Sequence, residues 1–526
     1  EKRRRRKRGQ FPDPDKRVFI NPEVCEGCGD CGVQSNCVSI VPLDTELGRK
    51  RAIDQSSCNK DFSCLNGFCP SFVTLSGATV RKGASRALDL PDIRMPDLPA
   101  IQGTHNVVIT GVGGTGVVTV GAVLAQAAQI AGLGAGMMEM AGLAQKGGAV
   151  HIHLRLANRP EDISAVRVAV GEADAVIGGD LVVTAGARTI GLMTTGRTGA
   201  VVNSHEIVTG DFTRNTEFRL PINTMEVSLQ ARLRDRLALF DASELARVAL
   251  GDSIYSNMMV LGGAWQKGLI PVPIDAIREA IRLNRAAVEG NLRAFEIGRW
   301  AVEFPDDAAA VLQPATVTAL TDPVAVRAER LTAYQNKRLT KRFLKLVDSV
   351  PDPALREAVA QGYYKLLAYK DEYEVARLHL QTADLARETF DGDFAMTFHL
   401  APPFLGGTGP DGRPRKRAFG GWMVGGFRVL AALKPLRGTP FDPFGYGAER
   451  REERALIRQF ESDMKAHLPT VSPATRDLLM ELALLPLSIR GYGPVKAANA
   501  ARAADRRAAI LAALGQGGTP QRQAAQ

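Results

Sequence analysis

The sequence predicts a mixed α/β protein in which a small cysteine-rich segment, a Rossmann-like domain with a parallel sheet and a mainly helical C-terminal domain follow one another. All seven cysteines lie between Cys25 and Cys69, and an apolar, strand-like run from His105 leads directly into a glycine-rich turn. Segments with helical periodicity dominate the last third of the chain. A length of 526 residues is enough for about two to four domains, each with its own core.

The predicted domain boundaries follow changes in composition. Residues 1–85 form a basic linker and the cysteine segment, and the Pro-rich stretch Leu90–Pro99 leads as an extended linker into an α/β domain at 100–304. Residues 315–515 form the helical domain. Residues 516–526 are predicted to be a disordered tail.

The positive charge of the chain is concentrated near its start. The net charge is +10, and residues 2–8 alone carry seven positive side chains. Such a run is a nucleic-acid or nuclear signal in some proteins, and a solvated linker or a face for an acidic partner in others. No nucleic-acid motif and no interleaved aromatic residues accompany it, so we expect no nucleic-acid partner.

Neither a signal peptide nor a membrane span is predicted. No apolar stretch of the signal-peptide type follows the basic run. Val107–Met138 is uncharged, but it is rich in Gly and Ala and contains Gln126 and Gln129, whereas a spanning helix needs about 20 strongly apolar residues. The composition, with 45% apolar and 23% charged residues, is that of a soluble globular protein.

The cysteine spacing is the most specific signal in the sequence. The order is Cys25-x2-Cys28-x2-Cys31-x5-Cys37, then Cys58-x5-Cys64-x4-Cys69-Pro70. The ferredoxin-type run C-x2-C-x2-C-x3-C-P wraps three thiolates around one cluster face, and the first three cysteines match its beginning. Gly27, Gly29 and Gly32 supply the loose backbone that such a wrap needs. We therefore predict a ferredoxin-like segment with at least one [4Fe–4S] cluster.

Two other interpretations of the cysteines were weighed. A disulfide framework is typical of small secreted domains, and this chain is large. Zinc usually takes paired C-x2-C knuckles with a spacer, whereas three cysteines at successive x2 spacing suit a cubane better. An iron–sulfur site also implies a reducing compartment, so the predicted location is the cytoplasm.

The pairing of the cysteines follows from a rule for two-cluster ferredoxins, in which the fourth cysteine of one run serves the other cluster. Cys69 would then complete the site of Cys25, Cys28 and Cys31. The remaining three, Cys37, Cys58 and Cys64, would hold a second cluster and need one outside ligand. The alternative is one cluster, with spare thiols that are structural or are held by an upstream segment.

The glycine-rich turn follows a strand and precedes a helix, as in nucleotide-binding folds. Its glycines are Gly111, Gly113, Gly114 and Gly116, and Val117–Ile130 has the composition of a buried helix. These glycines are candidates for binding a phosphate, because they let the backbone approach an anion at a helix N-terminus. The acidic residue expected on a second strand is represented only by Glu139, in the poor strand MMEMAG. We therefore favour a Rossmann-like scaffold without NAD. The alternative functions for the whole chain are an NAD-binding electron shuttle and a basic iron–sulfur protein that binds nucleic acid.

More α/β sequence follows the turn. Ala149–Leu156 alternates, with His151 and His153 on a face that we expect to be solvated or anion-facing rather than metal-binding. Further strands and helices complete a domain that ends near Phe304. The strands are expected at Ala173–Gly178 and Gly199–Ser204, and the helices at Ala242–Leu250 and Ala276–Leu292.

The C-terminal third is predicted from its amphipathic segments. Ala325–Val350 presents Leu331, Tyr334, Leu339 and Phe343 on one apolar face. Further helices are expected at Leu355–Leu385, Trp422–Leu433, Glu449–His467, Asp477–Leu484 and Ala497–Leu514. The basic Arg413–Arg417 loop is interpreted as a solvated face, with ferredoxin or a coenzyme A phosphate as the alternative contact.

Together these motifs resemble the gamma module of the 2-oxoacid ferredoxin oxidoreductases. Ala141–Gly148 is similar to a glycine-pair segment of that module, and Tyr255–Gly263 is similar to its Asn-Met-Leu-Gly-Ala stretch. Val24–Ile40 followed by Asp54–Thr74 resembles the fused bacterial indolepyruvate ferredoxin oxidoreductases. Ile489–Lys496 looks like the C-terminal signature of those enzymes, with Pro in place of the usual His.

The resemblance implies an oxidative decarboxylation. A 2-oxoacid such as indolepyruvate reacts with thiamine diphosphate and coenzyme A to give an acyl-CoA and carbon dioxide, and two electrons leave through iron–sulfur clusters to ferredoxin. The cofactor stabilises the carbanion, and protein groups orient it. The implied partners are the 2-oxoacid, coenzyme A, ferredoxin, a thiamine-binding domain or subunit, and further copies of the chain in a homo-oligomer.

The thiamine loop of that family is not found in this sequence. Its Gly-Asp-Gly opens a magnesium and diphosphate site, whereas Gly251-Asp252-Ser253 lacks the second Gly and Asp391-Gly392-Asp393 has another order. The chain also begins with Glu1 rather than Met. We therefore expect thiamine diphosphate and Mg²⁺ to bind outside this chain, which would be the C-terminal portion of a longer polypeptide or the partner of a thiamine subunit. No catalytic residue is assigned.

Overall fold

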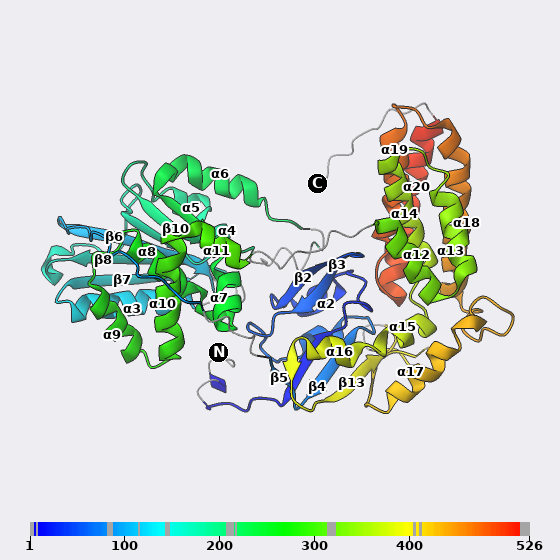
Figure 1. The fold of residues 1–526 in the computed structure, drawn as a ribbon, viewed down its shortest axis with the longest axis horizontal. Helices are drawn as coiled ribbons and strands as arrows, with labels where there is room; N and C mark the ends of the chain where they lie inside the picture. Colours follow the sequence, from blue (N-terminus) through cyan, green and yellow to red (C-terminus); the bar gives the residue numbers. More distant parts are fainter. Residues whose placement is uncertain are drawn as a thin grey trace.

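The structure is a computed structural model that describes residues 5–6, 9–81, 88–113, 116–141, 148–206, 215, 218–312, 322–402, 407–409 and 413–515. The predicted tail at 516–526 and Gly114 lie outside the described residues. Figure 1 shows an α/β domain on one side, the cysteine segment in the middle and a bundle of long helices on the other side. Across the described ranges, no helix is both long and apolar enough to cross a membrane.

The cysteine segment is built from short strands joined by the two cysteine runs. Its elements are β1 (Lys16–Ile20), α2 (Asp30–Ser35), β2 (Ile40–Thr45), β3 (Gly48–Ile53), the 3₁₀ helix η1 (Ser63–Asn66), β4 (Phe72–Ser76) and β5 (Thr79–Val80). β2 and β3 form a hairpin, and β1 pairs antiparallel with β4, with Ile20 opposite Phe72. Each cysteine run therefore begins after a strand and enters a short helix.

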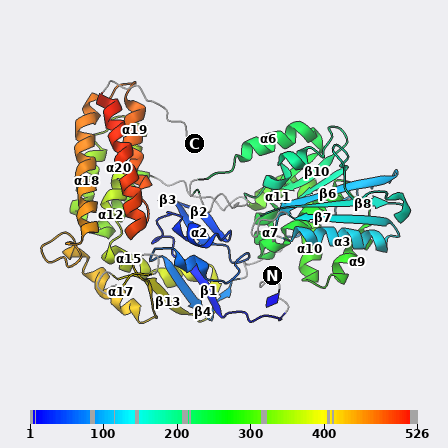
Figure 2. The ribbon, with the colours of Figure 1, turned by 180° about the vertical axis from the view of Figure 1, so that it is seen from behind.

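Strands from the C-terminal domain extend the sheet of the cysteine segment. They are β12 (Phe390–Asp391), β13 (Ala395–Leu400) and β14 (Arg417–Phe419). The sheet order is β1-β4-β13-β14, and β12 pairs with β5. Figure 2 shows β13 alongside β1 and β4. The prediction of two separate units is thus incomplete, because backbone hydrogen bonds join the cysteine segment to the C-terminal domain.

The α/β domain has one six-stranded sheet with helices on both faces. Its strands are β6 (Thr104–Val112), β7 (Gly134–Ala141), β8 (Ala149–Ala157), β9 (Ala175–Gly178), β10 (Gly199–Asn203) and β11 (Leu237–Phe240). The order is β11-β10-β9-β6-β8-β7; the first four strands are parallel, and β8 runs antiparallel to both of its neighbours. The sheet is therefore mixed, whereas the sequence predicted a parallel one.

Two apolar cores hold the helices of this domain against the sheet. The helices are α3 (Val117–Ile130), α4 (Leu181–Thr184), α5 (Ala187–Ile190), α6 (Ile222–Leu233), α7 (Ala242–Leu250), α8 (Ser256–Gln266), α9 (Ile274–Leu283), α10 (Val288–Glu303) and α11 (Pro305–Leu312), with 3₁₀ turns η2 (Pro160–Asp162), η4 (Arg234–Arg236) and η5 (Ser253–Tyr255). The larger core joins α3 and α7 to α10, and the smaller one joins α4 and α6. Leu90 and Ile93 of the predicted linker pack on the larger core, as does Leu88 just before it.

Two local predictions in this domain are wrong. The segment around Glu139 is strand β7, because it completes the edge beside β8. His151 and His153 are buried, with 5% and 2% of their surface exposed, rather than solvated. His153 Nδ1 accepts a 2.9 Å hydrogen bond from the Val168 amide, so a crossing segment covers the face that alternation marks as polar.

The C-terminal domain is mainly helical, as predicted, but its long segments are broken. The helices are α12 (Pro323–Tyr334), α13 (Lys337–Val347), α14 (Pro353–Leu367), α15 (Glu372–His379), α16 (Thr382–Arg387), α17 (Met423–Ala432), α18 (Ala448–His467), α19 (Arg476–Leu484) and α20 (Gly493–Gly515), with 3₁₀ turns η7 (Lys434–Leu436), η8 (Leu468–Thr470) and η9 (Leu485–Ser488). The predicted Ala325–Val350 helix is two helices, because Asn336 caps the second through the Leu339 amide.

Candidate iron–sulfur site

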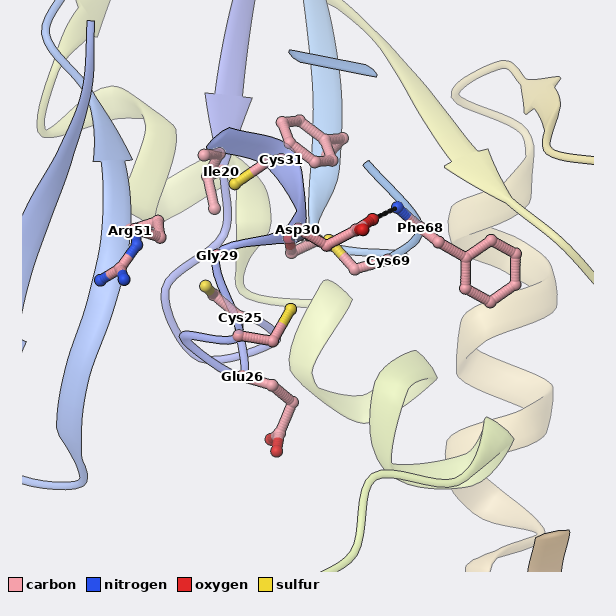
Figure 3. A pocket seen from close by; sticks show the side chains of 12 residues that line it. Ile20, Cys25, Glu26, Gly29, Asp30, Cys31, Arg51, Phe68 and Cys69 are labelled. Atoms are coloured by element: carbon pink, nitrogen blue, oxygen red, sulfur yellow. Dashed lines mark hydrogen bonds between the residues drawn. The ribbon is translucent and has the colours of Figure 1, made fainter. Parts of the chain in front are cut away.

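Four of the seven cysteines line one small cavity under β1 and β4. They are Cys25, Cys28, Cys31 and Cys69. Figure 3 shows the labelled Cys25, Cys31 and Cys69 around this space. The structure thus brings the first three cysteines together with the one that the pairing rule of two-cluster ferredoxins selects.

The loop around Cys25 and Cys28 depends on left-handed backbone. Gly27 and Gly29 have φ angles of 69° and 76°, which favour glycine. A Cβ at Gly27 would collide with the Arg49 carbonyl oxygen on β3. The Gly27 amide in turn donates a 3.3 Å hydrogen bond to Cys25 Sγ. The glycines that the sequence singled out therefore let the chain pass close to β3 while an amide points at a thiol.

The thiols of this site are buried and unbridged. All seven cysteines are free. Burial, reinforced by Cys69, raises the pKa of Cys28 to about 12 and the pKa of Cys31 well above its usual value. Four thiolates at this position therefore need a compensating cation, and iron bound by cysteine sulfur supplies one.

The donor set fits an iron–sulfur cluster. Within the ranges that the structure describes, no three His, Cys, Asp or Glu side chains are placed to hold one metal ion. A cubane is larger than one ion and separates its four thiolates more widely. Four cysteines around a cavity, with an amide directed at one sulfur, match the Cys₄ set of a [4Fe–4S] cluster.

The other three cysteines form a second group nearer the surface. Burial followed by the charges of Cys37 and Cys58 raises the pKa of Cys64 to about 12, and burial and Cys37 raise the pKa of Cys58 as well. Cys64 is buried, whereas Cys37 and Cys58 are partly exposed. The structure gathers Cys69 with the first three cysteines at one cavity, whereas a second ligand set of Cys37, Cys58 and Cys64 stays a prediction.

The C-terminal domain encloses the first group of cysteines, which is Cys25, Cys28, Cys31 and Cys69. Lys370, after α14, donates to the Cys25 carbonyl at 3.1 Å and pairs with the buried Glu26 carboxylate at 3.0 Å. Lys365 on α14 also pairs with Glu26. His379 on α15 donates a 3.0 Å hydrogen bond to the Pro70 carbonyl. No sequence pattern marks these contacts, because each residue belongs to an ordinary amphipathic helix or turn.

The C-terminal signature segment lies directly beside the first cysteine run. The Tyr492 hydroxyl donates to the Val24 carbonyl at 2.6 Å. A Cβ at Gly491 would lie 3.3 Å from Cys28 Cβ, and one at Gly493 would lie 2.6 Å from the Phe68 ring. The motif that carried the family resemblance therefore closes one wall of the cysteine site, and the unusual Pro494 is the second residue of helix α20.

Two basic residues of the Arg413–Arg417 loop also face the cysteine segment. Arg413 forms a 3.0 Å ion pair with Asp30, which accepts a 2.6 Å hydrogen bond from the Phe68 amide. Lys416 donates to the carbonyl oxygens of Leu65 and Gly67 at 3.0 and 2.8 Å. The interpretation of this loop as a solvated face is wrong for these two residues.

The glycine turn of the α/β domain lies at the end of β6, as predicted. A Cβ at Gly111 would collide with Val117, and one at Gly113 would lie 3.2 Å from the Gly148 carbonyl. Gly116 has a φ of 103°, and a Cβ there would lie 3.4 Å from the Asn257 amide. Packing of the strand against the helix therefore explains Gly111 without a phosphate, and the roles of these glycines in cofactor binding stay a prediction.

Two aspartates near the strand ends have structural roles that the sequence did not reveal. Asp180, after β9, is fully buried and caps α4 through the Val183 amide at 2.8 Å; burial raises its pKa. Asp252 of the Gly-Asp-Ser triplet caps η5 and accepts a 3.0 Å hydrogen bond from Ser56. Asp252 thus links the α/β domain to the loop before Cys58.

Two family models match the chain. Residues 106–301 match the model described as pyruvate ferredoxin/flavodoxin oxidoreductase. Residues 320–509 match a family of unknown function, DUF6537. The two matches coincide with the α/β domain and the helical domain.

Curated relatives and a solved structure match a little over a third of the chain. The indolepyruvate oxidoreductase subunit IorB of Archaeoglobus fulgidus is 30% identical over 195 residues, which cover 37% of this chain and 92% of the relative. The same subunit of Thermococcus kodakarensis is 29% identical over 197 residues, with 37% and 94% covered. A solved keto/oxoacid ferredoxin oxidoreductase gamma subunit of Geobacter sulfurreducens is 21% identical, with 38% and 98% covered and a TM-score of 0.28.

These two relatives are matched over nearly their whole length. The pyruvate ferredoxin/flavodoxin oxidoreductase model matches residues 106–301, which build most of the six-stranded sheet and its helices. Through this domain the chain belongs to the 2-oxoacid:ferredoxin oxidoreductase family, among the relatives of the indolepyruvate oxidoreductase subunits.

Proposed function

We propose that this chain is the electron-carrying, gamma-type part of an indolepyruvate ferredoxin oxidoreductase. The complete enzyme would oxidatively decarboxylate aryl 2-oxoacids to acyl-CoA and pass the electrons to ferredoxin. The observation that carries the proposal is the convergence of Cys25, Cys28, Cys31 and Cys69 on one cavity, in a chain whose α/β domain matches indolepyruvate oxidoreductase subunits.

The four cysteines would hold a [4Fe–4S] cluster through their thiolates. When bound there, the cluster takes up and releases one electron at a time. The residues of the chain tune this chemistry. The Gly27 amide donates to Cys25 Sγ, and the C-terminal domain covers the site with Tyr492 and Lys370, so that water is kept away from the sulfurs.

Thiamine diphosphate and Mg²⁺ would be bound by a partner domain or subunit. In support, Asp252 lies in the triplet most similar to the Gly-Asp-Gly of a thiamine loop, but its carboxylate already caps a 3₁₀ helix. The same carboxylate accepts a hydrogen bond from the Ser56 hydroxyl. The 2-oxoacid and coenzyme A would bind with the thiamine domains, in a cytoplasmic homo-oligomer. In this arrangement the α/β domain is a scaffold, which agrees with the packing that explains Gly111.

Basic side chains near the second cysteine group support an acidic electron acceptor. Arg6 donates to the Asn59 carbonyl, one residue after Cys58, and Arg5 and Arg6 both lie over the Phe11 ring. A basic patch accelerates encounter with an acidic protein such as ferredoxin. The partly exposed Cys58 and Cys37 therefore lie where electrons would leave.

The test uses the chain purified without oxygen together with its thiamine-binding partner. We expect iron and cluster absorbance in the chain, and bleaching of that absorbance when indolepyruvate and coenzyme A are added. Ferredoxin should then restore the absorbance. A chain that binds no iron, or clusters that stay oxidised with every aryl 2-oxoacid supplied, would contradict the proposal.

A further inference from the structure

The two cysteine runs repeat one another along the sequence. Cys58 and Cys64 are separated by five residues, as are Cys25 and Cys31. When the runs are placed on each other, Asp61 occupies the position that Cys28 holds in the first run. The second run therefore has the spacing C-x2-D-x2-C.

The backbone repeats as well. Gly27 and Gly29 of the first run have φ angles of 69° and 76°, and the equivalent Lys60 and Phe62 have φ angles of 50° and 60°. A residue with a Cβ adopts this left-handed conformation at a cost of about 1 kcal/mol. The second loop keeps the shape of the first although it lacks the glycines that make this shape easy.

Hydrogen bonds to the sulfurs follow the same repeat. The Lys60 amide donates to Cys58 Sγ at 3.4 Å, as the Gly27 amide donates to Cys25 Sγ at 3.3 Å. The turns that begin the two short helices also match. The Gly32 amide donates to Gly29 at 2.9 Å, and the Leu65 amide donates to Phe62 at 3.0 Å.

Helices α2 and η1 begin one residue before Cys31 and Cys64, respectively. In the first run this shape directs Cys25, Cys28 and Cys31 into one cavity, where Cys69 of the other run joins them. By the same exchange between the runs, Cys37 of the first run would join Cys58 and Cys64 of the second. The second group then lacks a fourth ligand. The residue in the position of Cys28 is Asp61.

Asp61 lies midway between Cys58 and Cys64, three positions from each, in the loop that repeats the shape of the first run. The side chain is exposed, and it accepts hydrogen bonds from the amide and the hydroxyl of Ser63 at 3.2 and 2.9 Å. It is therefore held at the loop by its neighbour, as a carboxylate of the kind that can serve as an oxygen ligand to a metal.

We infer that Asp61 is the fourth ligand of a second [4Fe–4S] cluster, held also by Cys37, Cys58 and Cys64. The inference rests on the proposed function, because it assumes that the chain binds clusters. It goes further by assigning the ligand that three cysteines lack. A carboxylate oxygen is a harder and less tightly held ligand for iron than a thiolate, so the iron at Asp61 is the one that leaves first.

This assignment has a defined chemical consequence. A one-electron oxidant such as ferricyanide converts [4Fe–4S]²⁺ into [3Fe–4S]⁺ and Fe²⁺, and ferricyanide takes the electron released. The bond that breaks is the one between iron and the Asp61 carboxylate. A cluster with four thiolates, such as that of Cys25, Cys28, Cys31 and Cys69, resists this step.

The test compares the full chain with its Asp61→Cys and Asp61→Ala variants, purified without oxygen. Iron is counted, and EPR follows each sample as ferricyanide is added. The unsubstituted chain should hold about eight irons and should develop one [3Fe–4S]⁺ signal per chain. Asp61→Cys should hold the same iron and develop little of that signal, and Asp61→Ala should carry the three-iron signal before any oxidant is added.

The matched control is Asp13→Ala, because Asp13 pairs with Lys60 at 2.8 Å but lies outside the repeated spacing. It should behave as the unsubstituted chain does. Equal three-iron signals from the Asp61→Cys and unsubstituted chains, or a complete second cluster in Asp61→Ala, would overturn the inference and leave the proposed function intact. A chain without any iron would overturn both.

Discussion

The ammonium of Lys416 donates a 2.8 Å hydrogen bond to the carbonyl oxygen of Gly67, although 349 positions separate the two residues. A second hydrogen bond, of 3.0 Å, reaches Leu65. Both acceptors lie between Cys64, which belongs to the second group of cysteines, and Cys69, which belongs to the first. The same ammonium lies 4.9 Å from the centre of the Phe72 ring. The C-terminal domain therefore places a positive charge beside the stretch that joins the two proposed cluster sites.

Replacement of Lys416 by Met should lower the reduction potential of the clusters. Reduction adds negative charge, which a nearby ammonium stabilises, so its loss favours the oxidised state by about a few tens of mV. Redox titration followed by EPR measures the change. Lys416→Arg should keep the potential, and Lys434→Met, which removes an ammonium bonded to Ala333, serves as the remote control. A potential unchanged in Lys416→Met would show that the ammonium has only a structural role.

Gly27 offers a test of the first cysteine loop. In Gly27→Ala the new methyl group would collide with the Arg49 carbonyl, in addition to the strain of a positive φ angle. Because Gly27 lies between Cys25 and Cys28, a shift of its backbone displaces their thiols, so we expect the loss of about four irons per chain.

The matched control for this substitution is Gly48→Ala in the β2–β3 turn. Gly48 also has a positive φ angle, of 93°, but a Cβ there meets nothing within 4 Å. It should cost about 1 kcal/mol of stability and keep its iron. If both variants retain full iron, measured by metal analysis after anaerobic purification, the close approach to Arg49 does not govern cluster binding.

Much of this arrangement was predictable where the signal is local or follows a spacing rule. Helix α7 begins and ends at the predicted Ala242 and Leu250, because Asp241 caps the first turn and Gly251 ends the helix in the left-handed conformation. The gathering of Cys69 with the first three cysteines followed from the exchange of fourth ligands between ferredoxin runs.

The parts that were missed depend on partners far away in the sequence. Strand β13 pairs with β4 through Phe398 and Val73, and a six-residue strand carries no mark of a partner more than 300 positions earlier. The contact of Lys370 with Cys25 was missed for the same reason, because it forms only when the C-terminal domain packs against the cysteine segment. Alternation in β8 predicted a solvated histidine face, since periodicity reports two faces of a strand but not what covers them.

The burial of His153 in β8 makes the stability of the fold depend on pH. The ring is 2% exposed, and burial followed by the charges of His151 and nearby arginines lowers the pKa of His153 to about 4. In the unfolded chain a histidine has a pKa of about 6.5. Between these two values the unfolded chain binds more protons than the folded one, so the stability that neutral His153 provides is complete above pH 6.5 and is lost as the pH falls towards 4.

We therefore expect the melting temperature of the α/β domain to fall between pH 6.5 and pH 4, with His153 contributing up to about 3 kcal/mol of the loss. His153→Gln keeps an acceptor for the Val168 amide but has no proton to gain, so its melting temperature should depend less steeply on pH. Calorimetric scans at several pH values compare the two proteins, and His467→Gln at the end of α18 is the control. His151, whose pKa burial also lowers, leaves a residual slope in all three. Identical slopes for His153→Gln and the unsubstituted chain would show that another group governs the acid response.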